Sequence, residues 1–107
     1  MTTFDDREQA FEARFAKDQD TEFKAVARAN RLLGLWGGAL MGLEMTHLED
    51  YALAVVKSDV DRHSEDGVVR KVFEDLKGAG VSASEADVRM KMDELMAVAR
   101  EQIRTGA

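Results

Sequence analysis

Apolar residues recur every three to four positions along most of this chain, which is the period of an α-helix. No stretch combines two-residue alternation with an enrichment in β-branched or aromatic residues, so no strand is expected. The sequence also contains no proline, and nothing in it therefore forbids long helices. The pattern predicts an all-α protein.

Cap residues and the apolar period delimit a first helix from Asp20 or Thr21 to about Leu43. Its apolar stripe is interrupted at Asn30, and it consists of Phe23, Val26, Leu33, Trp36, Leu40 and Leu43. The second helix is predicted to begin at Thr46, because Thr46 and Glu49 have the spacing of a capping box. One face of it carries Leu48, Tyr51, Ala52, Val55 and Val56.

The third helix is predicted to follow Ser64 and to end at Gly78 or Gly80, since glycine readily takes the left-handed conformation of a helix end. Its apolar face consists of Val69, Val72, Phe73 and Leu76. The fourth is predicted to open with a second capping box, Ser82 with Glu85. It would bury Val88, Met92, Leu95, Ala99 and Ile103. Residues 20–107 are thus expected to form an antiparallel four-helix bundle.

Four glycines lie close together inside the first predicted helix, at Gly34, Gly37, Gly38 and Gly42. A glycine within a helix costs about 1 kcal/mol relative to alanine, so the group needs a reason. Close approach of another helix is the favoured explanation. A bend around Trp36 or a groove for a partner is the alternative.

The first nineteen residues have a different composition. Phe4, Phe11 and Phe15 are almost their only large apolar side chains, and on a helix these fall within an arc of roughly 40°. So narrow a stripe among charged residues gives little area for docking on the bundle. We expect residues 1–19 to be a mobile segment that is marginally helical in water and becomes ordered on a partner.

The composition of the chain disfavours several classes of function. The 107 residues fit one domain, and a net charge of −6 disfavours a nucleic-acid partner and a polybasic membrane anchor. There is no cysteine for a disulfide or a thiolate site. The longest apolar stretch, Leu32 to Leu43, is too short to cross a bilayer, and the N-terminus lacks the features of a signal peptide. A cytoplasmic protein without membrane insertion is expected.

Signatures of catalysis are missing from the sequence. It has no phosphate-binding glycine loop and no activated nucleophile, and His47 and His63 belong to no ligand motif. An acidic stretch from Asp59 fails as a calcium loop, because Ser64 and Arg70 stand where that loop has glycine and glutamate. The sequence therefore predicts a protein that is not an enzyme, has no metal site and acts by binding a partner.

A basic stripe at helical spacing, Lys24, Arg28 and Arg31, stands out in this acidic chain. A solvated face with intrahelical pairs, such as Asp20 with Lys24, explains it without a ligand. An anion-binding role is the alternative.

Several blocks of residues together resemble the zeta-subunit family of bacterial F-type ATP synthases, over essentially the whole chain. The most specific are the N-terminal run from Phe4 to Ala16 and the Leu-Leu-Gly-Leu-Trp run ending at Trp36. Others are Phe23 to Ala25, Arg28, Arg31, Gly42, Tyr51-Ala52, Val55 to Asp59 and Arg70 to Phe73.

The resemblance implies a four-helix protein, monomeric when free, that inhibits ATP hydrolysis by the catalytic head of the synthase. It implies that the N-terminal segment inserts at an α/β interface near the γ subunit, becomes helical there and blocks rotation. The implied contact residues are Phe4, Asp5, Arg7, Phe11, Glu12 and Phe15. The bound protein would lie in the cytoplasm, peripheral to the inner membrane.

Two other functions remain open at this point. One is a ligand-binding module in which the bundle binds an adenine nucleotide or similar anion through Lys24, Arg28 and Arg31, and no other cofactor is expected. The other is a structural helical subunit without regulatory activity.

Overall fold

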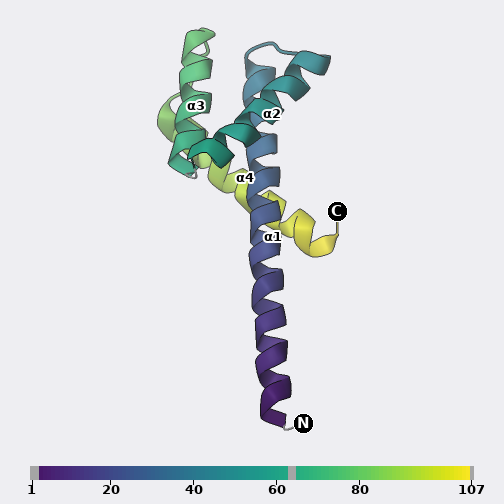
Figure 1. Ribbon diagram of the computed structural model, residues 1–107. Coiled ribbons are helices and arrows are strands. Elements are labelled where there is room, and N and C mark those ends of the chain that lie inside the picture. Colours follow the sequence, from purple (N-terminus) through teal and green to yellow (C-terminus); the bar gives the residue numbers. More distant parts are fainter. Residues whose placement is uncertain (1–2, 63–64, 107) are drawn as a thin grey trace.

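The computed structural model describes the backbone of residues 3–62 and 65–106 and the side chains of residues 20–59 and 65–106. Four helices make up this part of the chain, and no strand occurs in it (Figure 1). They are α1 (Thr3–Leu40), α2 (Met45–Arg62), α3 (Glu65–Gly78) and α4 (Glu85–Thr105). The predicted all-α four-helix bundle is confirmed.

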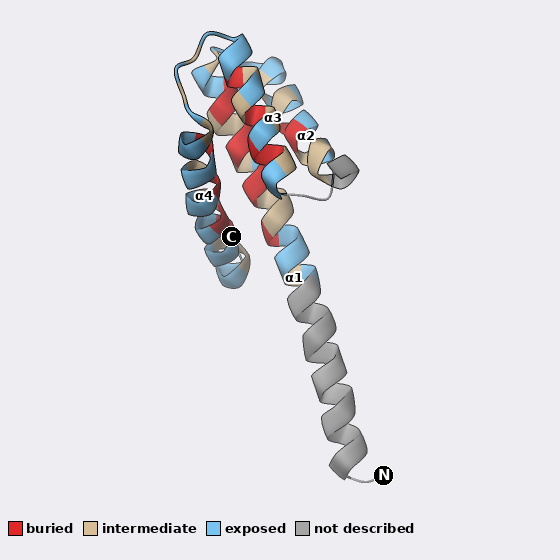
Figure 2. Ribbon diagram, turned by 90° about the vertical axis from the view of Figure 1, so that its left-hand side faces the viewer, coloured by how far each residue is buried: buried red, intermediate tan, exposed pale blue. Residues whose placement is uncertain are grey.

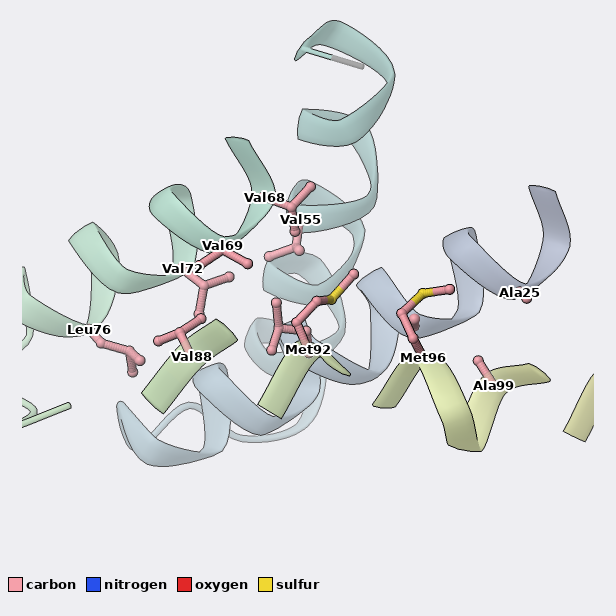
Figure 3. Close-up of a cluster of buried hydrophobic side chains, with 12 residues drawn as sticks. Ala25, Val55, Val68, Val69, Val72, Leu76, Val88, Met92, Met96 and Ala99 are labelled. Carbon is pink, nitrogen blue, oxygen red and sulfur yellow. The ribbon is translucent and has the colours of Figure 1, made fainter. Parts of the chain in front are cut away.

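The core lies where α2, α3 and α4 pack around the second half of α1, which contacts all three (Figure 2). Its buried members are Ala25, Ala29, Leu33, Val55, Val68, Val69, Val72, Leu76, Val88, Met92, Met96 and Ala99 (Figure 3). Full burial of a valine or leucine side chain contributes about 1.5–3 kcal/mol, so these helical faces supply most of the stability. The face predicted for α3 lies in this core or against it. Of the face predicted for α2, Val55 and Ala52 are buried and Tyr51 packs against the core, whereas Leu48 and Val56 are half-buried.

The stripe predicted on α1 was partly wrong. Phe23 and Leu40 are 70% and 46% exposed, whereas Ala25 and Ala29 are fully buried. Ala25 and Ala29 share the core with Ala99 of α4, so small side chains that the predicted stripe left out form this part of the core. Helix packing over alanine cannot be read from large apolar residues alone.

Three glycines of α1 pack closely against α2 and α3, and at Gly34 the nearest neighbouring atom belongs to the backbone. A Cβ atom on Gly34 would lie 2.7 Å from the Ala52 Cα atom. A Cβ on Gly38 would lie 2.6 Å from Leu48 Cδ1, and one on Gly37 would lie 3.0 Å from a methyl of Val72. We call this contact the glycine seam. It confirms close packing as the reason for three of the four glycines of the cluster.

Gly42 belongs to the end of α1 instead of to its packing face. Its φ of +84° is left-handed, and the Leu43 amide donates to the Gly38 carbonyl at 3.0 Å. Gly80 repeats the arrangement after α3, with a φ of +81° and a 2.9 Å bond from the Val81 amide to the Leu76 carbonyl. Both ends are Schellman motifs, which satisfy the last carbonyls of a helix.

The capping box of α4 lies two residues beyond the predicted one. The Asp87 amide donates to Ser84 Oγ, and the Ser84 amide donates to the Asp87 carboxylate, each at 3.0 Å. The prediction of Ser82 with Glu85 was therefore wrong. The physical reason is the preceding Schellman motif, which holds Val81 back against α3 and delays the start of α4.

The box predicted for α2 was also wrong. The helix begins at Met45, and the carboxylate of Glu49 accepts hydrogen bonds from Arg31 of α1 at 3.0 and 3.4 Å. Met45 has a φ of +50°, and no other non-glycine residue in the described part has a positive φ. Such a conformation costs about 1–3 kcal/mol for a residue with a side chain.

The helix α1 begins at Thr3 and ends at Leu40, instead of running from Asp20 or Thr21 to Leu43. Asp20 does not act as a cap, because it lies inside α1, and its carboxylate pairs with Lys24 one turn later at 3.1 Å. The predicted division into a mobile segment 1–19 and a bundle 20–107 concerns side chains that lie outside the described residues, and it stays a prediction.

Candidate functional site

A hollow of about 370 Å³ opens between α1 and α4, beside the ends of α2 and α3. Four of its lining side chains are apolar: Phe23, Val26, Met92 and Met96. The polar ones are Glu22, Asn30, Asp59, Glu65 and Arg100. Figure 3 shows Met92 and Met96 on successive turns of α4. An apolar hollow with a few polar groups is the usual form of a small-molecule site.

Asn30 is the unusual residue of this hollow. It is only 1% exposed, and neither its Oδ1 nor its Nδ2 atom has a hydrogen-bond partner among the described residues. Buried polar groups in folded proteins are nearly always hydrogen-bonded, and leaving one unsatisfied costs about 1–3 kcal/mol. The amide carries one donor group and one acceptor group, but both atoms are closed off from solvent, so a molecule in the hollow reaches them only when neighbouring side chains move.

An ion pair borders the same hollow and links α1 to α4. Arg100 donates to the carboxylate of Glu22 through Nη2 at 2.7 Å and through Nε at 3.3 Å. This two-point hydrogen bond lowers the pKa of Glu22 and raises that of Arg100. Both side chains are about half exposed, so the pair is accessible to solvent and to ligands.

The predicted anion-binding residues reach three different partners. Lys24 pairs with Asp20 on α1, Arg31 reaches Glu49 on α2, and Arg28 donates to the side chain of Gln102 on α4 at 3.4 Å. None of the three is among the described residues that line the hollow. The structure thus spreads this stripe over the helix contacts and does not gather it into one pocket.

A second polar cluster ties α2 to α3. The Tyr51 hydroxyl donates to Asp75 Oδ2 at 2.9 Å, and Lys71 Nζ lies 3.1 Å from the same oxygen. Burial raises the pKa of the Tyr51 phenol, and the hydrogen bond to ionised Asp75 raises it further. Because all three groups satisfy one another, this cluster is structural.

Sequence reasoning missed the hollow. It identified Asn30 only as a break in an apolar stripe, and Met92 only as a core residue. The available signal was a polar residue, Asn30, at a position expected to be buried. Its interpretation depends on the packing of α4 opposite α1, which cannot be predicted from the sequence pattern.

The predicted partner-binding residues, Phe4, Asp5, Arg7, Phe11, Glu12 and Phe15, lie outside the described side chains. Among the described residues, no group of three or more His, Cys, Asp or Glu side chains could hold a metal ion. In the same part, no helix has the length and apolar character to cross a membrane.

Comparisons with known proteins agree with this architecture. A chain solved by solution NMR is 41% identical and superimposes with a TM-score of 0.69, over 80% of this chain and 98% of that one. A search of curated proteins gave no match. The model of the family described as ATPase inhibitor subunit zeta matches residues 1–102. The chain therefore belongs to the zeta family of ATPase inhibitor subunits.

Proposed function

We propose that this protein inhibits ATP hydrolysis by the catalytic head of an F-type ATP synthase. Residues 1–19 insert at an α/β interface near γ and block rotation in the hydrolytic direction. The observation that carries the proposal is the extent of the family match, which includes residues 1–19 together with the bundle.

In this proposal the bundle and residues 1–19 have separate roles. Its buried core runs from Ala25 to Ala99 and draws on all four helices. A bundle with such a core can fold without using residues 1–19. The aromatic stripe of Phe4, Phe11 and Phe15 then remains available for a groove on the partner, the mode in which amphipathic helices are recognised.

In this mechanism the phenylalanines are anchors, and the charged residues Asp5, Arg7 and Glu12 set the direction and register of the segment. The inhibitor performs no chemistry of its own. It stops hydrolysis mechanically, because the catalytic subunits cannot complete their cycle while the rotor is held.

The test is ATP hydrolysis by the purified head from the same organism, with the full chain and with a chain lacking residues 1–17. We expect inhibition by the full chain only, with both chains folded by circular dichroism. Phe11→Ala and Phe15→Ala should each weaken inhibition about tenfold, the range of a moderate anchor residue. Met90→Ala is the control, because Met90 is 71% exposed on α4, far along the chain from the segment. Equal inhibition by the truncated chain would contradict the proposal.

A second candidate function is binding of an adenine nucleotide, and the unsatisfied Asn30 favours it. A side-chain amide can pair with the N6 and N7 edge of adenine, and the exposed ring of Phe23 can stack on a base. Glu22, Asp59 and Glu65 make the rim acidic, which disfavours phosphates inside the hollow. The base would thus occupy the hollow, and the phosphates would remain outside near Arg100.

Titration of the protein with ADP and with adenosine, followed by NMR, tests this candidate. We expect both ligands to shift the amide signals around the hollow, and Asn30→Leu to abolish the shifts. Arg31→Gln is the matched control, since Arg31 belongs to the predicted basic stripe but does not line the hollow. If Arg31→Gln abolished binding and Asn30→Leu did not, the basic stripe would be the site instead.

A further inference from the structure

Two side-chain contacts join the last turns of α4 to the early part of α1. Arg100 donates to the Glu22 carboxylate at 2.7 and 3.3 Å, and Arg28 donates to the side chain of Gln102 at 3.4 Å. The first of these is a two-point bond between ionised groups, which fixes the relative orientation of the two side chains. We call Glu22, Arg28, Arg100 and Gln102 the α4 brace.

The α4 brace lies where the buried part of α1 begins. Among the described residues of α1, the first buried side chain is that of Ala25, which shares the core with Ala99 of α4 (Figure 3). Glu22 precedes Ala25 by three positions, and Phe23 between them is 70% exposed. The brace therefore extends the contact of α4 with α1 by about one helical turn beyond the core, toward residues 1–19.

Residues 3–19 precede the brace on the same helix, since α1 runs without interruption from Thr3 to Leu40. The first turn of an isolated helix is disfavoured by about a thousandfold, whereas each further residue adds one hydrogen bond to a turn that already exists. The narrow apolar stripe of residues 1–19 predicts only marginal helicity for this segment alone. Helix formation in the segment can therefore start from the turn that α4 holds.

We propose that the α4 brace acts as the helix nucleus for residues 1–19 when they bind the ATPase head. This inference rests on the proposed function. With the brace closed, the segment becomes helical by extension of α1, and no new nucleus has to form on the partner. Without it, the turn around Glu22 frays and has to be ordered during binding, which weakens the affinity. Glu22 and Arg100 are thus positioning residues, and they set how much inhibitor is needed.

The experiment measures inhibition curves with the purified head, and NMR secondary chemical shifts of the free protein, for Arg100→Glu. This variant opposes Glu22 with a like charge and releases the outer turn of the contact. The inhibitor concentration for half-inhibition should rise about fivefold, while inhibition at saturation stays complete. The helical shifts of residues 8–19 should weaken, and those of the core should not change.

Arg104→Glu is the matched control, because Arg104 lies about one turn further along α4 and pairs with Glu101 of the same helix. Combining Arg100→Glu with Glu22→Arg should restore the native half-inhibition concentration, since the reversed pair joins the two helices again. Adding Asp18→Ala to Arg100→Glu should recover part of the lost potency, because alanine is the better helix former. A role of Arg100 in the fold alone would not respond to a change at Asp18.

Equal half-inhibition concentrations for Arg100→Glu and the native chain would overturn the brace proposal and leave the proposed function standing. A loss of potency with unchanged helical shifts of residues 8–19 would also overturn it, because Arg100 would then be a contact with the partner. If the native full chain did not inhibit the head, both proposals would be overturned.

Discussion

The helix α1 packs closely against α2 and α3 but leaves a hollow against α4. Against α2 and α3 it forms the glycine seam, where a Cβ atom on Gly34 would lie 2.7 Å from the backbone of its neighbour. Against α4 it leaves a hollow of about 370 Å³ with an unsatisfied amide at Asn30 and an exposed ion pair at its border. One face is packed to the backbone, and the other is incompletely filled.

The difference shows how a small bundle can combine stability with function. Backbone-to-backbone packing over glycine fixes the register of α1 and leaves no room for a ligand. The hollow contributes less to stability and keeps polar groups that a ligand can use. Because a single helix bears both, changes on its two sides are expected to have opposite effects.

The largest effect should come from filling the glycine seam. Gly34→Val is expected to destabilise the protein by about 2–3 kcal/mol, because the new side chain would meet the Ala52 backbone, which cannot rotate away. Urea unfolding measures this directly. Gly78→Ala is the control: no atom lies within 4 Å of its added Cβ, and it should be neutral or stabilising by up to about 1 kcal/mol. Equal stability of Gly34→Val and the native chain would show that the seam is not rigid.

The next largest effect on stability is expected from a change at Tyr51, which packs on the glycine seam and donates a hydrogen bond to α3. Its phenol pKa is raised in the folded state, so its contribution to stability is complete below the unfolded value of about 10. That contribution is lost as the pH rises from there toward the folded value. Since this is the only tyrosine in the chain, tyrosinate absorbance reports its titration cleanly.

Tyr51→Phe should remove this alkaline loss of stability and cost about 1–2 kcal/mol at neutral pH, the value of a hydrogen bond to a charged group. Urea unfolding near neutral pH and above pH 10, for both chains, gives the comparison. A Tyr51 phenol that titrated at its ordinary pKa in the folded protein would contradict the assigned contacts.

On the other side of α1, Asn30→Leu should stabilise the protein by about 1 kcal/mol. It removes a buried amide without partners, and the neighbouring hollow accepts the added methyl groups. Thermal unfolding without ligand measures the change. Asn30→Asp is the contrasting variant, since a buried carboxylate should destabilise the same place. A loss of stability in Asn30→Leu would mean that the amide is satisfied in solution.

The smallest effect is expected from Glu22→Gln. The pair with Arg100 is half exposed, so solvent screens it and its contribution stays below about 1 kcal/mol. Because Arg100 lowers the pKa of Glu22, that contribution is present above the unfolded pKa and is lost as the pH falls through the folded value. Unfolding at low and at high salt should show a difference only at low salt. Glu74→Gln is the control, because Glu74 pairs with Arg70 within α3.

Features that depend on a single segment of the chain could be predicted from the sequence, whereas features that depend on contacts between helices could not. The existence of four helices, the apolar faces of α3 and α4 and the packing role of three glycines follow from patterns within single segments. The caps did not follow: Ser82 and Ser84 both have an acidic residue three positions on, and only the contact of Val81 with α3 selects Ser84. The carboxylate of Glu49 bonds to Arg31, a residue of another helix, instead of forming a capping box with Thr46. The hollow needs Asn30 and Met92 to face each other across two helices, and no local pattern encodes that.

The bond between Glu22 and Arg100 also has a consequence for the order of folding. It joins residues 78 positions apart, whereas the contact of Gly34 with Ala52 in the glycine seam joins two helices that follow each other directly. Contacts between neighbours close short loops and form early, and those between the two ends of a chain carry the larger entropy cost and form late. The loosely filled contact of α4 with α1 is accordingly the last to form and the first to open. Brief, reversible separation of α4 would then expose the hollow while the rest of the bundle stays folded.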